Sequence, residues 1–428
     1  MKLVRTTGRS AKQAEQLLRS LEQRGAADTA RVEPAVRRII ADIRRGGDKA
    51  LRNYAHKLDG LSPESQLRIT EAEMQDALAT ISPQVRDALQ TAAVNIRTFA
   101  QQQMPRDFAL DVTSGVSAGQ RVLPLSAVGC YVPSGRYPLP STLLMTVIPA
   151  QVAGVERIVV VSPKPAKETL AAAALLGVEH FYRVGGAHAI AALAYGTATI
   201  PRVDKIVGPG NIYVTTAKKL VAFNCAIDML AGPTEIVVAT ESGDPEWLAA
   251  DIVAQAEHDP QALSILVTSN STLARDLIGQ VKLQSKKNPI ARESLSKHGY
   301  AFLTGSAQET RAVTNRLAPE HLTVDSPPDV DWVRNAGSVF IGADTPQTMG
   351  DYITGPNHVL PTGSIARARG GLSVLDFIKL ITVQQYSPDG LAALGPKAAE
   401  LAEAEGLTAH AASIRTRLNR ADNKKGKK

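Results

Sequence analysis

Residues 157–184 read RIVVVSPKPAKETLAAAALLGVEHFYRV. A β-branched apolar run is followed by an alanine-rich stretch of helical length and then by a second short apolar run, which is the order strand, helix, strand. The same alternation extends from Ala127 to about Ala239, with AVGCYV and DKIVG as further strands. Strands separated by helices predict a parallel sheet covered by helices, a Rossmann-like α/β domain.

A second stretch of this kind runs from Glu235 to about Phe340. Its predicted strands read EIVVAT, SILVTS, YAFLTG, LTVDS and SVFIG. Asp244 and Pro245 predict a helix start after the first strand, because a carboxylate caps a helix and proline suits its first turn. A chain of 428 residues exceeds one ordinary domain, and two α/β lobes account for that length.

The flanking segments follow other patterns. Residues 9–105 carry apolar side chains at helical spacing, with a break predicted at Gly46 and Gly47. Residues 114–125 are rich in turn-forming residues, and residues 341–372 are expected to form loops. The last 55 or so residues are predicted to be helical.

Composition excludes several classes of protein. Hydrophobic residues make up 44% of the chain and charged residues 21%, which suits a large soluble core. Cys130 and Cys225 form no disulfide framework, and the N-terminus lacks an apolar signal core, so we expect a cytoplasmic protein. No window suits a membrane span. Four lysines between residues 424 and 428 contribute to the net charge of +7, and without nearby aromatics we expect a solvated tail and no nucleic-acid arm.

Four side chains in the C-terminal half of the chain can ligate a metal. Gln255 and His258 are three residues apart on the helix predicted from Pro245, so they share a face. Such a pair can equally be a polar helix surface or a histidine satisfied in the core. Asp351 and His410 support the prediction of a Zn²⁺ site only if the fold brings them to the helix face that carries Gln255 and His258.

An adjacent acid and imidazole, Glu320 and His321, follow Pro319 and precede a predicted strand. A proton-transferring enzyme needs such a pair, although a surface ion pair beside a strand-edge histidine is the ordinary alternative. His358 lies in a glycine- and proline-rich loop, where a histidine is more often a ligand contact than it is on a helix.

Two glycine turns follow strands of the first sheet. GPGNIYV at 208–214 lets the backbone approach a ligand, and Gly185 and Gly186 form the second turn. Glycine pairs after a strand are common, and the chain lacks a GxGxxG motif followed by an acidic residue. A dinucleotide would therefore bind in a non-standard way.

These motifs together resemble the histidinol dehydrogenase family, over residues 115–410. The similarity is carried by long strings: GCYVPSGRYPLPSTLLM, DKIVGPGNIYVTTAK, IDMLAGPTE, AQAEHDPQA, APEHL, NAGSVF and GDYITGPNHVLPTG. The resemblance implies two Rossmann-like domains, one interrupted by the other, with helical extensions. Residues 24–125 and 234–372 would form the first, metal-binding and catalytic domain, 126–233 the NAD-binding domain, and 1–23 and 373–428 the extensions.

The resemblance also implies the residues of the site. It places Zn²⁺ on Gln255, His258, Asp351 and His410, with the last two steps of histidine biosynthesis as the activity. His410 and Glu405 would reach the site from the partner in a homodimer with shared active sites. Substrate contacts would come from the four metal ligands, Thr234, His321, His358 and Glu405, and NAD contacts from Tyr131, His188 and Asn211.

The implied reaction oxidises L-histidinol to L-histidine through a bound aldehyde. His321 takes the alcohol proton as a hydride leaves to NAD⁺, Glu320 activates water against the aldehyde, and a second hydride leaves to a second NAD⁺. Zinc would position the substrate through its amine and imidazole nitrogens.

Three features depart from the family pattern. His188 stands where the family usually has glutamine, and Thr234 where it usually has serine. The affinities for cofactor and substrate can therefore differ from those usual in the family. Arg367 and Arg369 replace the aromatic and small residues common there, with no functional interpretation. The alternative is therefore a family paralogue that oxidises another primary alcohol, such as a sulfonated diol, with NAD.

Overall fold

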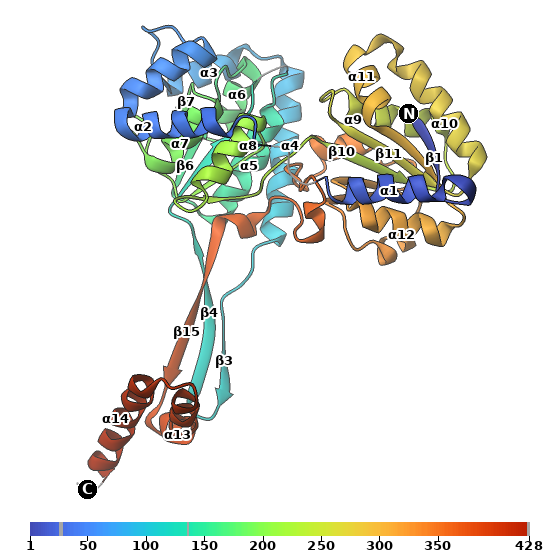
Figure 1. The fold of residues 1–428 in the computed structure, drawn as a ribbon. Coiled ribbons are helices and arrows are strands. Elements are labelled where there is room, and N and C mark those ends of the chain that lie inside the picture. The colour runs from blue at the N-terminus through green and yellow to red at the C-terminus, as the bar shows by residue number, and fades with distance from the viewer. Residues whose placement is uncertain (25–28, 135–136, 426–428) are drawn as a thin grey trace. The chain divides into compact units, whose positions relative to one another are not determined.

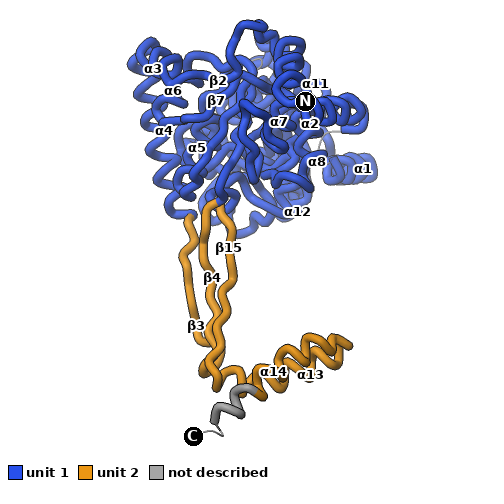
Figure 2. Tube along the Cα trace, turned by 90° about the vertical axis from the view of Figure 1, so that its left-hand side faces the viewer, with its two compact units in different colours: residues 1–103, 125–377 blue, residues 104–124, 378–428 orange. Residues whose placement is uncertain are grey.

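The computed structural model describes residues 1–24, 29–134 and 137–425, with side chains as far as Asn419. The chain forms two compact units, residues 1–103 with 125–377 and residues 104–124 with 378–428 (Figure 2). The first unit holds two six-stranded sheets, and the second holds a three-stranded sheet. In the described ranges, no helix has the length and apolar character needed to cross a membrane.

The first predicted sheet is present and lies around residues 127–227 (Figure 1). Its strand order is β2-β7-β6-β5-β8-β9, parallel except for β2. Every residue of β5 is buried, as expected for a strand between two covered faces. The strands are β2 (Arg68–Ile69), β5 (Ala127–Tyr131), β6 (Arg157–Val161), β7 (His180–Tyr182), β8 (Lys205–Val207) and β9 (Ala226–Ile227).

Helices cover this sheet in two groups (Figure 1). In one group α3 (Glu71–Thr80) and α4 (Pro83–Gln102) pack on α5 (Pro140–Ala153) and α6 (Lys167–Leu175). In the other, α2 (Glu33–Tyr54) packs on α7 (Gly186–Tyr195) and α8 (Ile212–Val221). The predicted break in α2 appears as a kink at Gly47, whose φ is 50°.

The placement of α2, α3 and α4 differs from the grouping that the resemblance implied. Residues 24–125 were expected with residues 234–372, yet these three helices pack on helices of the 126–233 sheet. Val36, Ile39 and Ile43 of α2 share one buried apolar cluster with Ile190 and Val214. Helical spacing identified these faces as apolar and carried no information about which sheet they cover.

The second predicted sheet is entirely parallel, in the order β1-β12-β11-β10-β13-β14. Apolar side chains on its two faces form separate clusters, one with residues of α9, α10 and α11 and one with residues of α1 and α12. Figure 1 shows these two groups of helices on opposite faces of the sheet. Its strands are β1 (Lys2–Arg5), β10 (Glu235–Ala239), β11 (Leu263–Thr268), β12 (Gly299–Leu303), β13 (His321–Val324) and β14 (Ser338–Ile341). Its helices are α1 (Ala11–Glu22), α9 (Pro245–Ala256), α10 (Ser271–Gln284), α11 (Pro289–His298) and α12 (Ala307–Leu317).

The second unit corrects two predictions. Residues 114–125, expected to be turns, lie mostly in β4 (Val116–Pro124), which pairs antiparallel with β3 (Phe108–Thr113) and β15 (Ile378–Tyr386). The helical prediction for the C-terminus is wrong over β15, whose β-branched residues favour a strand. Helices α13 (Pro388–Ala404) and α14 (Thr408–Lys425) then follow as predicted. The lysine tail expected to be solvated lies outside the described side chains.

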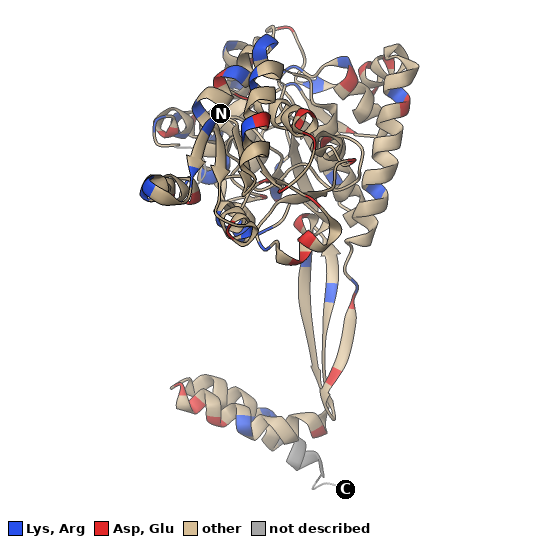
Figure 3. Cartoon of the chain, turned by 90° about the vertical axis from the view of Figure 1, so that its right-hand side faces the viewer, with Lys and Arg blue, Asp and Glu red and all other residues tan. Residues whose placement is uncertain are grey.

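The three strands of the second unit expose apolar side chains. Every residue of β3 is exposed, and so is nearly all of β15. Their charged residues are few, namely Asp111, Arg121 and Lys379 (Figure 3). The exposed large apolar side chains are Phe108, Leu110, Val112, Leu380, Ile381, Val383 and Tyr386.

Candidate active site

The predicted acid and imidazole lie where β13 begins. Helix α12 ends at Leu317, and Ala318 turns the chain with a left-handed φ of 46°. Glu320 and His321 follow with exposed fractions of only 6% and 3%. The pair is therefore buried within the first unit, which excludes the surface ion pair that the sequence left open.

Glu320 is held as a hydrogen-bond acceptor. Its Oε2 accepts from the Thr234 hydroxyl at 2.6 Å and from the Glu235 backbone N–H at 2.8 Å. Since both donors lie at the start of β10, the neighbouring strand orients this carboxylate. The same oxygen lies 3.6 Å from Nδ1 of His321.

His321 faces two carboxylates. Its Nδ1 lies 3.2 Å from the carbonyl oxygen of Glu235 and 3.4 Å from Nε2 of Gln255, and its Nε2 lies 3.4 Å from Oδ1 of Asp351. Burial would lower the pKa of His321, but the charges and hydrogen bonds of Glu320 and Asp351 outweigh it and raise the pKa to about 10. The carbonyl and carboxylate oxygens around both ring nitrogens therefore favour the imidazolium form of His321.

Asp351 and His358 complete this polar group. Burial would raise the pKa of Asp351, but the hydrogen bond from His321 and nearby histidine charges lower it. Burial lowers the pKa of His358, and its ring bridges the backbone oxygen of Asp351 at 2.6 Å and the Thr142 hydroxyl at 3.3 Å. A neutral His358 satisfies both contacts, donating from Nδ1 and accepting at Nε2.

These residues enclose what we call the small cavity, of about 190 Å³. Three of the four predicted metal ligands, Gln255, His258 and Asp351, line it. Gln255 lies in the last turn of α9. His258 lies just beyond the helix end, where its backbone N–H donates to the carbonyl of Gln255. The other lining side chains of the predicted site are Thr234, Glu320, His321 and His358.

The donor set suits a borderline metal ion, although the ligands do not form a closed shell. In the ranges covered by the structure, no three His, Cys, Asp or Glu side chains come close enough to hold a metal. The Asp351 side chain is only 15% exposed. Among the described residues it pairs with a histidine, and with no lysine or arginine. A buried carboxylate beside imidazole and amide donors fits Zn²⁺.

Glu405 and His410 belong to the second unit. Glu405 follows α13, Gly406 turns the chain with a φ of 78°, and His410 lies in the first turn of α14. Both side chains are exposed. Their assignment to the substrate and the metal stays a prediction.

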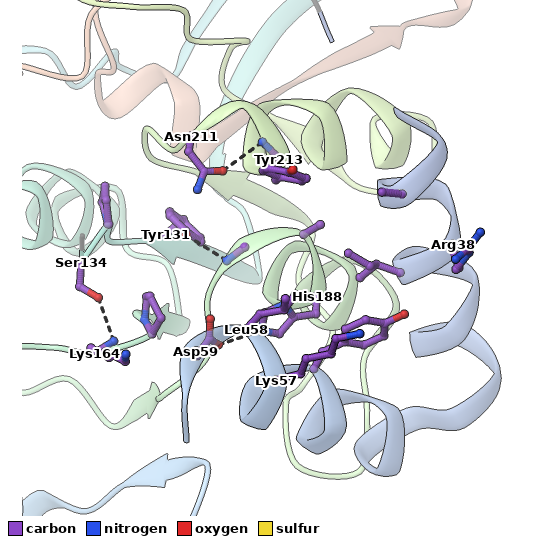
Figure 4. A pocket seen from close by; sticks show the side chains of 17 residues that line it. Arg38, Lys57, Leu58, Asp59, Tyr131, Ser134, Lys164, His188, Asn211 and Tyr213 are labelled. Atoms are coloured by element: carbon purple, nitrogen blue, oxygen red, sulfur yellow. Dashed lines mark hydrogen bonds and ion pairs between the residues drawn. The ribbon is translucent and has the colours of Figure 1, made fainter. Parts of the chain in front are cut away.

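A second space, which we call the large cavity, has a volume of about 720 Å³ and lies at the first sheet (Figure 4). Tyr131, His188 and Asn211, the three residues expected to contact NAD, all line it. The Tyr131 hydroxyl accepts a hydrogen bond from the Gly186 backbone at 3.1 Å, and burial raises the pKa of Tyr131 to about 12. The hydroxyl therefore keeps its proton at neutral pH.

His188 is fully buried and has a partner that the sequence did not suggest. Its Nε2 lies 2.8 Å from Oδ2 of Asp59, which also accepts from the Gly185 backbone at 3.0 Å (Figure 4). Asp59 thereby places a carboxylate at the start of α7, where a ligand phosphate would otherwise be favoured. Because Asp59 lies in an irregular helical turn 129 residues away, no local motif could have identified it.

The GPGN turn follows β8 as predicted. A side chain at Gly208 would approach the Tyr131 carbonyl to 2.2 Å, so only glycine fits there. Two buried residues hold the turn: Asp228 accepts from the Gly208 N–H at 2.8 Å, and Lys218 donates to the Gly208 carbonyl at 2.9 Å. Pro209 lines the small cavity and Asn211 the large one, so this turn joins the two spaces.

The two unexplained arginines have structural partners. Arg369 pairs with Asp376 at 2.9 Å and donates to the backbone oxygen of Asp228. Arg367 donates to the backbone oxygen of Arg316. Arg367 therefore ties its 3-10 turn to α12, and neither arginine lines the small or the large cavity.

Comparison with known proteins agrees with the resemblance. The family model described as histidinol dehydrogenase matches residues 22–418. The histidinol dehydrogenase of Methanothermobacter thermautotrophicus is 47% identical over 93% of this chain and 96% of its own, and that of Aquifex aeolicus 45% identical over 94% and 96%. The crystal structure of histidinol dehydrogenase from Elizabethkingia anophelis, 34% identical, covers 99% of both chains with a TM-score of 0.92.

Proposed function

This chain belongs to the histidinol dehydrogenase family, and we propose on that premise that it oxidises L-histidinol to L-histidine with two molecules of NAD⁺. The observation that carries the proposal is the buried pair of Glu320 and His321, held together in the small cavity with the predicted metal ligands. When bound, NAD⁺ supplies a hydride acceptor for each of two steps, and zinc supplies a cationic centre for the substrate nitrogens.

The first oxidation needs a base for the alcohol proton. His321 is suited to it, because Nδ1 is engaged by the Glu235 carbonyl and Nε2 is turned toward Asp351 in the small cavity. The neighbouring carboxylates stabilise the imidazolium that forms when Nε2 takes the proton. Loss of this proton together with a hydride from the carbinol carbon leaves the substrate as the aldehyde.

The second oxidation needs water to attack the aldehyde. The Glu320 carboxylate lies beside His321 and accepts two hydrogen bonds that fix its orientation. We assign to it the proton of the attacking water, and to His321 the proton of the resulting hydrate. Burial of both groups excludes bulk water and strengthens their electrostatic interactions.

For the metal we propose Gln255, His258 and Asp351 from one protomer, with His410 of the partner subunit as the fourth ligand. Support comes from the three side chains that line one cavity and from the exposure of His410 and Glu405 in the second unit. A homodimer is further supported by the exposed apolar side chains of β3 and β15, because such patches mark interaction surfaces.

Mixing two inactive variants tests the shared site. His321→Asn removes the base from one chain and His410→Ala removes the donor given to the other. After co-refolding in equal amounts, a mixed dimer keeps one intact site, so about a quarter of parental activity should return. Activity no higher than that of the separate variants contradicts sharing between subunits.

For NAD⁺ we propose the large cavity, with Tyr131, His188 and Asn211 as contacts. Its volume suits part of a dinucleotide, and the GPGN turn gives it a wall in common with the small cavity. Since Asp59 already occupies the start of α7, we assign the phosphate charges to the basic side chains Lys57 and Lys164, which also line this cavity.

The alternative, a paralogue that oxidises a sulfonated or other diol, rests on Thr234 and His188. The hydroxyl of Thr234 still donates to Glu320, as serine would, which favours histidinol. Steady-state NADH formation decides between them. Turnover of L-histidinol supports the proposal, and turnover of an anionic diol without turnover of histidinol overturns it.

A further inference from the structure

Gln347 is a buried polar residue that no motif suggested. It is fully buried and opens the short 3-10 helix Gln347–Asp351, whose last residue is a predicted metal ligand. Its Nε2 donates a hydrogen bond to Oε1 of Gln255 at 3.1 Å. One side chain therefore connects the turn that carries Asp351 with the helix that carries Gln255.

The backbone of Gln347 makes a second tie to the same helix. Its N–H donates to the carboxylate of Asp251, one turn before Gln255 on α9. Two contacts to successive turns fix both the distance and the rotation between α9 and the 3-10 helix. The relative positions of Gln255 and Asp351 thus depend on Gln347.

The hydrogen bonds around Gln255 have a fixed direction. The Thr234 hydroxyl gives its proton to the Glu320 carboxylate, so its oxygen must accept from Nε2 of Gln255. That contact turns Oε1 of Gln255 toward Gln347, which donates to it. Donors therefore run in one order, from Gln347 through Gln255 and Thr234 to Glu320.

One atom of Gln347 has no such role. Its own Oε1 is buried, and no described atom donates a hydrogen bond to it. An unsatisfied buried oxygen is destabilising, so an apolar residue would serve packing better. An amide is needed at this position because its Nε2 donates a hydrogen bond to Oε1 of Gln255. That hydrogen bond uses one lone pair of the Gln255 oxygen and leaves the other available.

We propose that Gln347 is a positioning residue for the metal site, holding Oε1 of Gln255 and the turn of Asp351 in ligating geometry. The inference rests on the zinc site of the proposed function. Residues that orient metal ligands typically change metal affinity by about 10- to 100-fold when replaced. We expect a loss of that size without Gln347.

The experiment compares zinc retention in full-length holoprotein. Gln347→Met keeps the length and removes the donor, and Gln347→Glu keeps the shape but cannot donate when ionised. Gln284→Met is the matched control, because Gln284 also donates to α9, at the Glu246 carbonyl (2.8 Å). Each protein is titrated with a chelator, and bound zinc is measured by atomic emission, with melting temperatures recorded for the metal-free forms.

We expect both Gln347 variants to release zinc at about 10- to 100-fold lower chelator concentration than the parent, and Gln284→Met to match the parent. Activity of the Gln347 variants should return at saturating zinc, which loss of the fold would not allow. Parental zinc retention in either folded Gln347 variant overturns the role of Gln347. A parent that retains no zinc instead overturns the proposed metal site itself.

Discussion

The small and large cavities differ in how their polar atoms are satisfied. In the small cavity, Glu320, His321 and Asp351 contact one another or shared partners, so each side chain fixes the next. In the large cavity, Nδ1 of His188 has no described partner, and the Tyr131 hydroxyl accepts a hydrogen bond only from the backbone N–H of Gly186 among the described residues. A fully connected group responds to substitution as a unit, whereas isolated contacts act separately. Substitutions should therefore have large effects in the small cavity and graded effects in the large one.

His321→Asn is the strongest test of this difference. Asparagine cannot accept a proton, so kcat should fall by about 10³-fold or more. Zinc content should stay at the parental level, because His321 is not among the proposed ligands. Bound zinc by atomic emission and NADH formation by absorbance measure the two effects. Near-parental turnover would show that the connected group of the small cavity does not perform the proton transfer.

Glu320→Gln should separate the two oxidations. The amide cannot accept the proton of water, so we expect the second oxidation to fall by about 10²-fold while oxidation of histidinol to the aldehyde continues. The charge of Glu320 raises the pKa of His321, so its removal should also shift the rise of the first step with pH to lower pH. Single-turnover NADH formation from histidinol and from the aldehyde, at several pH values, measures both. Equal losses in the two steps contradict the assignment of Glu320.

Substitution of His188 should produce a smaller, separable effect in the large cavity. His188→Gln keeps an amide near Nε2 and the contact with Asp59, whereas His188→Asn keeps one near Nδ1. If Nδ1 contacts the cofactor, Gln should raise KM for NAD⁺ about tenfold and Asn less, with kcat nearly unchanged. Initial rates at varied NAD⁺ measure this. The opposite order assigns His188 a structural role through Asp59.

Sequence patterns identified the α/β architecture and most strands, because apolar periodicity reports local structure. They missed β15, where IKLITVQQY lies inside a stretch predicted to be helical, and β1, which pairs with residues nearly 300 positions away. The proposed functional side chains were assigned through the family strings, since spacing alone left Gln255 and His258 open to other interpretations. Asp59, Lys218 and Gln347 were missed because each acts through a contact that no local pattern encodes.

Asp251 of α9 provides the smallest expected effect, which is on stability. Burial raises the pKa of this carboxyl to about 6, from 3.8 in the unfolded chain, although a hydrogen bond from the Gln347 backbone opposes the shift. Between those values the folded state binds a proton that the unfolded state does not, so stability falls as pH rises through that range.

Asp251→Asn is neutral at every pH and its oxygen still accepts from Gln347. It should exceed the parent in stability by about 1 kcal/mol or less at pH 7–8, a figure reduced because the carboxyl is only half-buried, and lose that advantage below about pH 4. Denaturant unfolding at both pH values measures this, and an advantage that does not depend on pH would show that ionisation of Asp251 within α9 costs no stability.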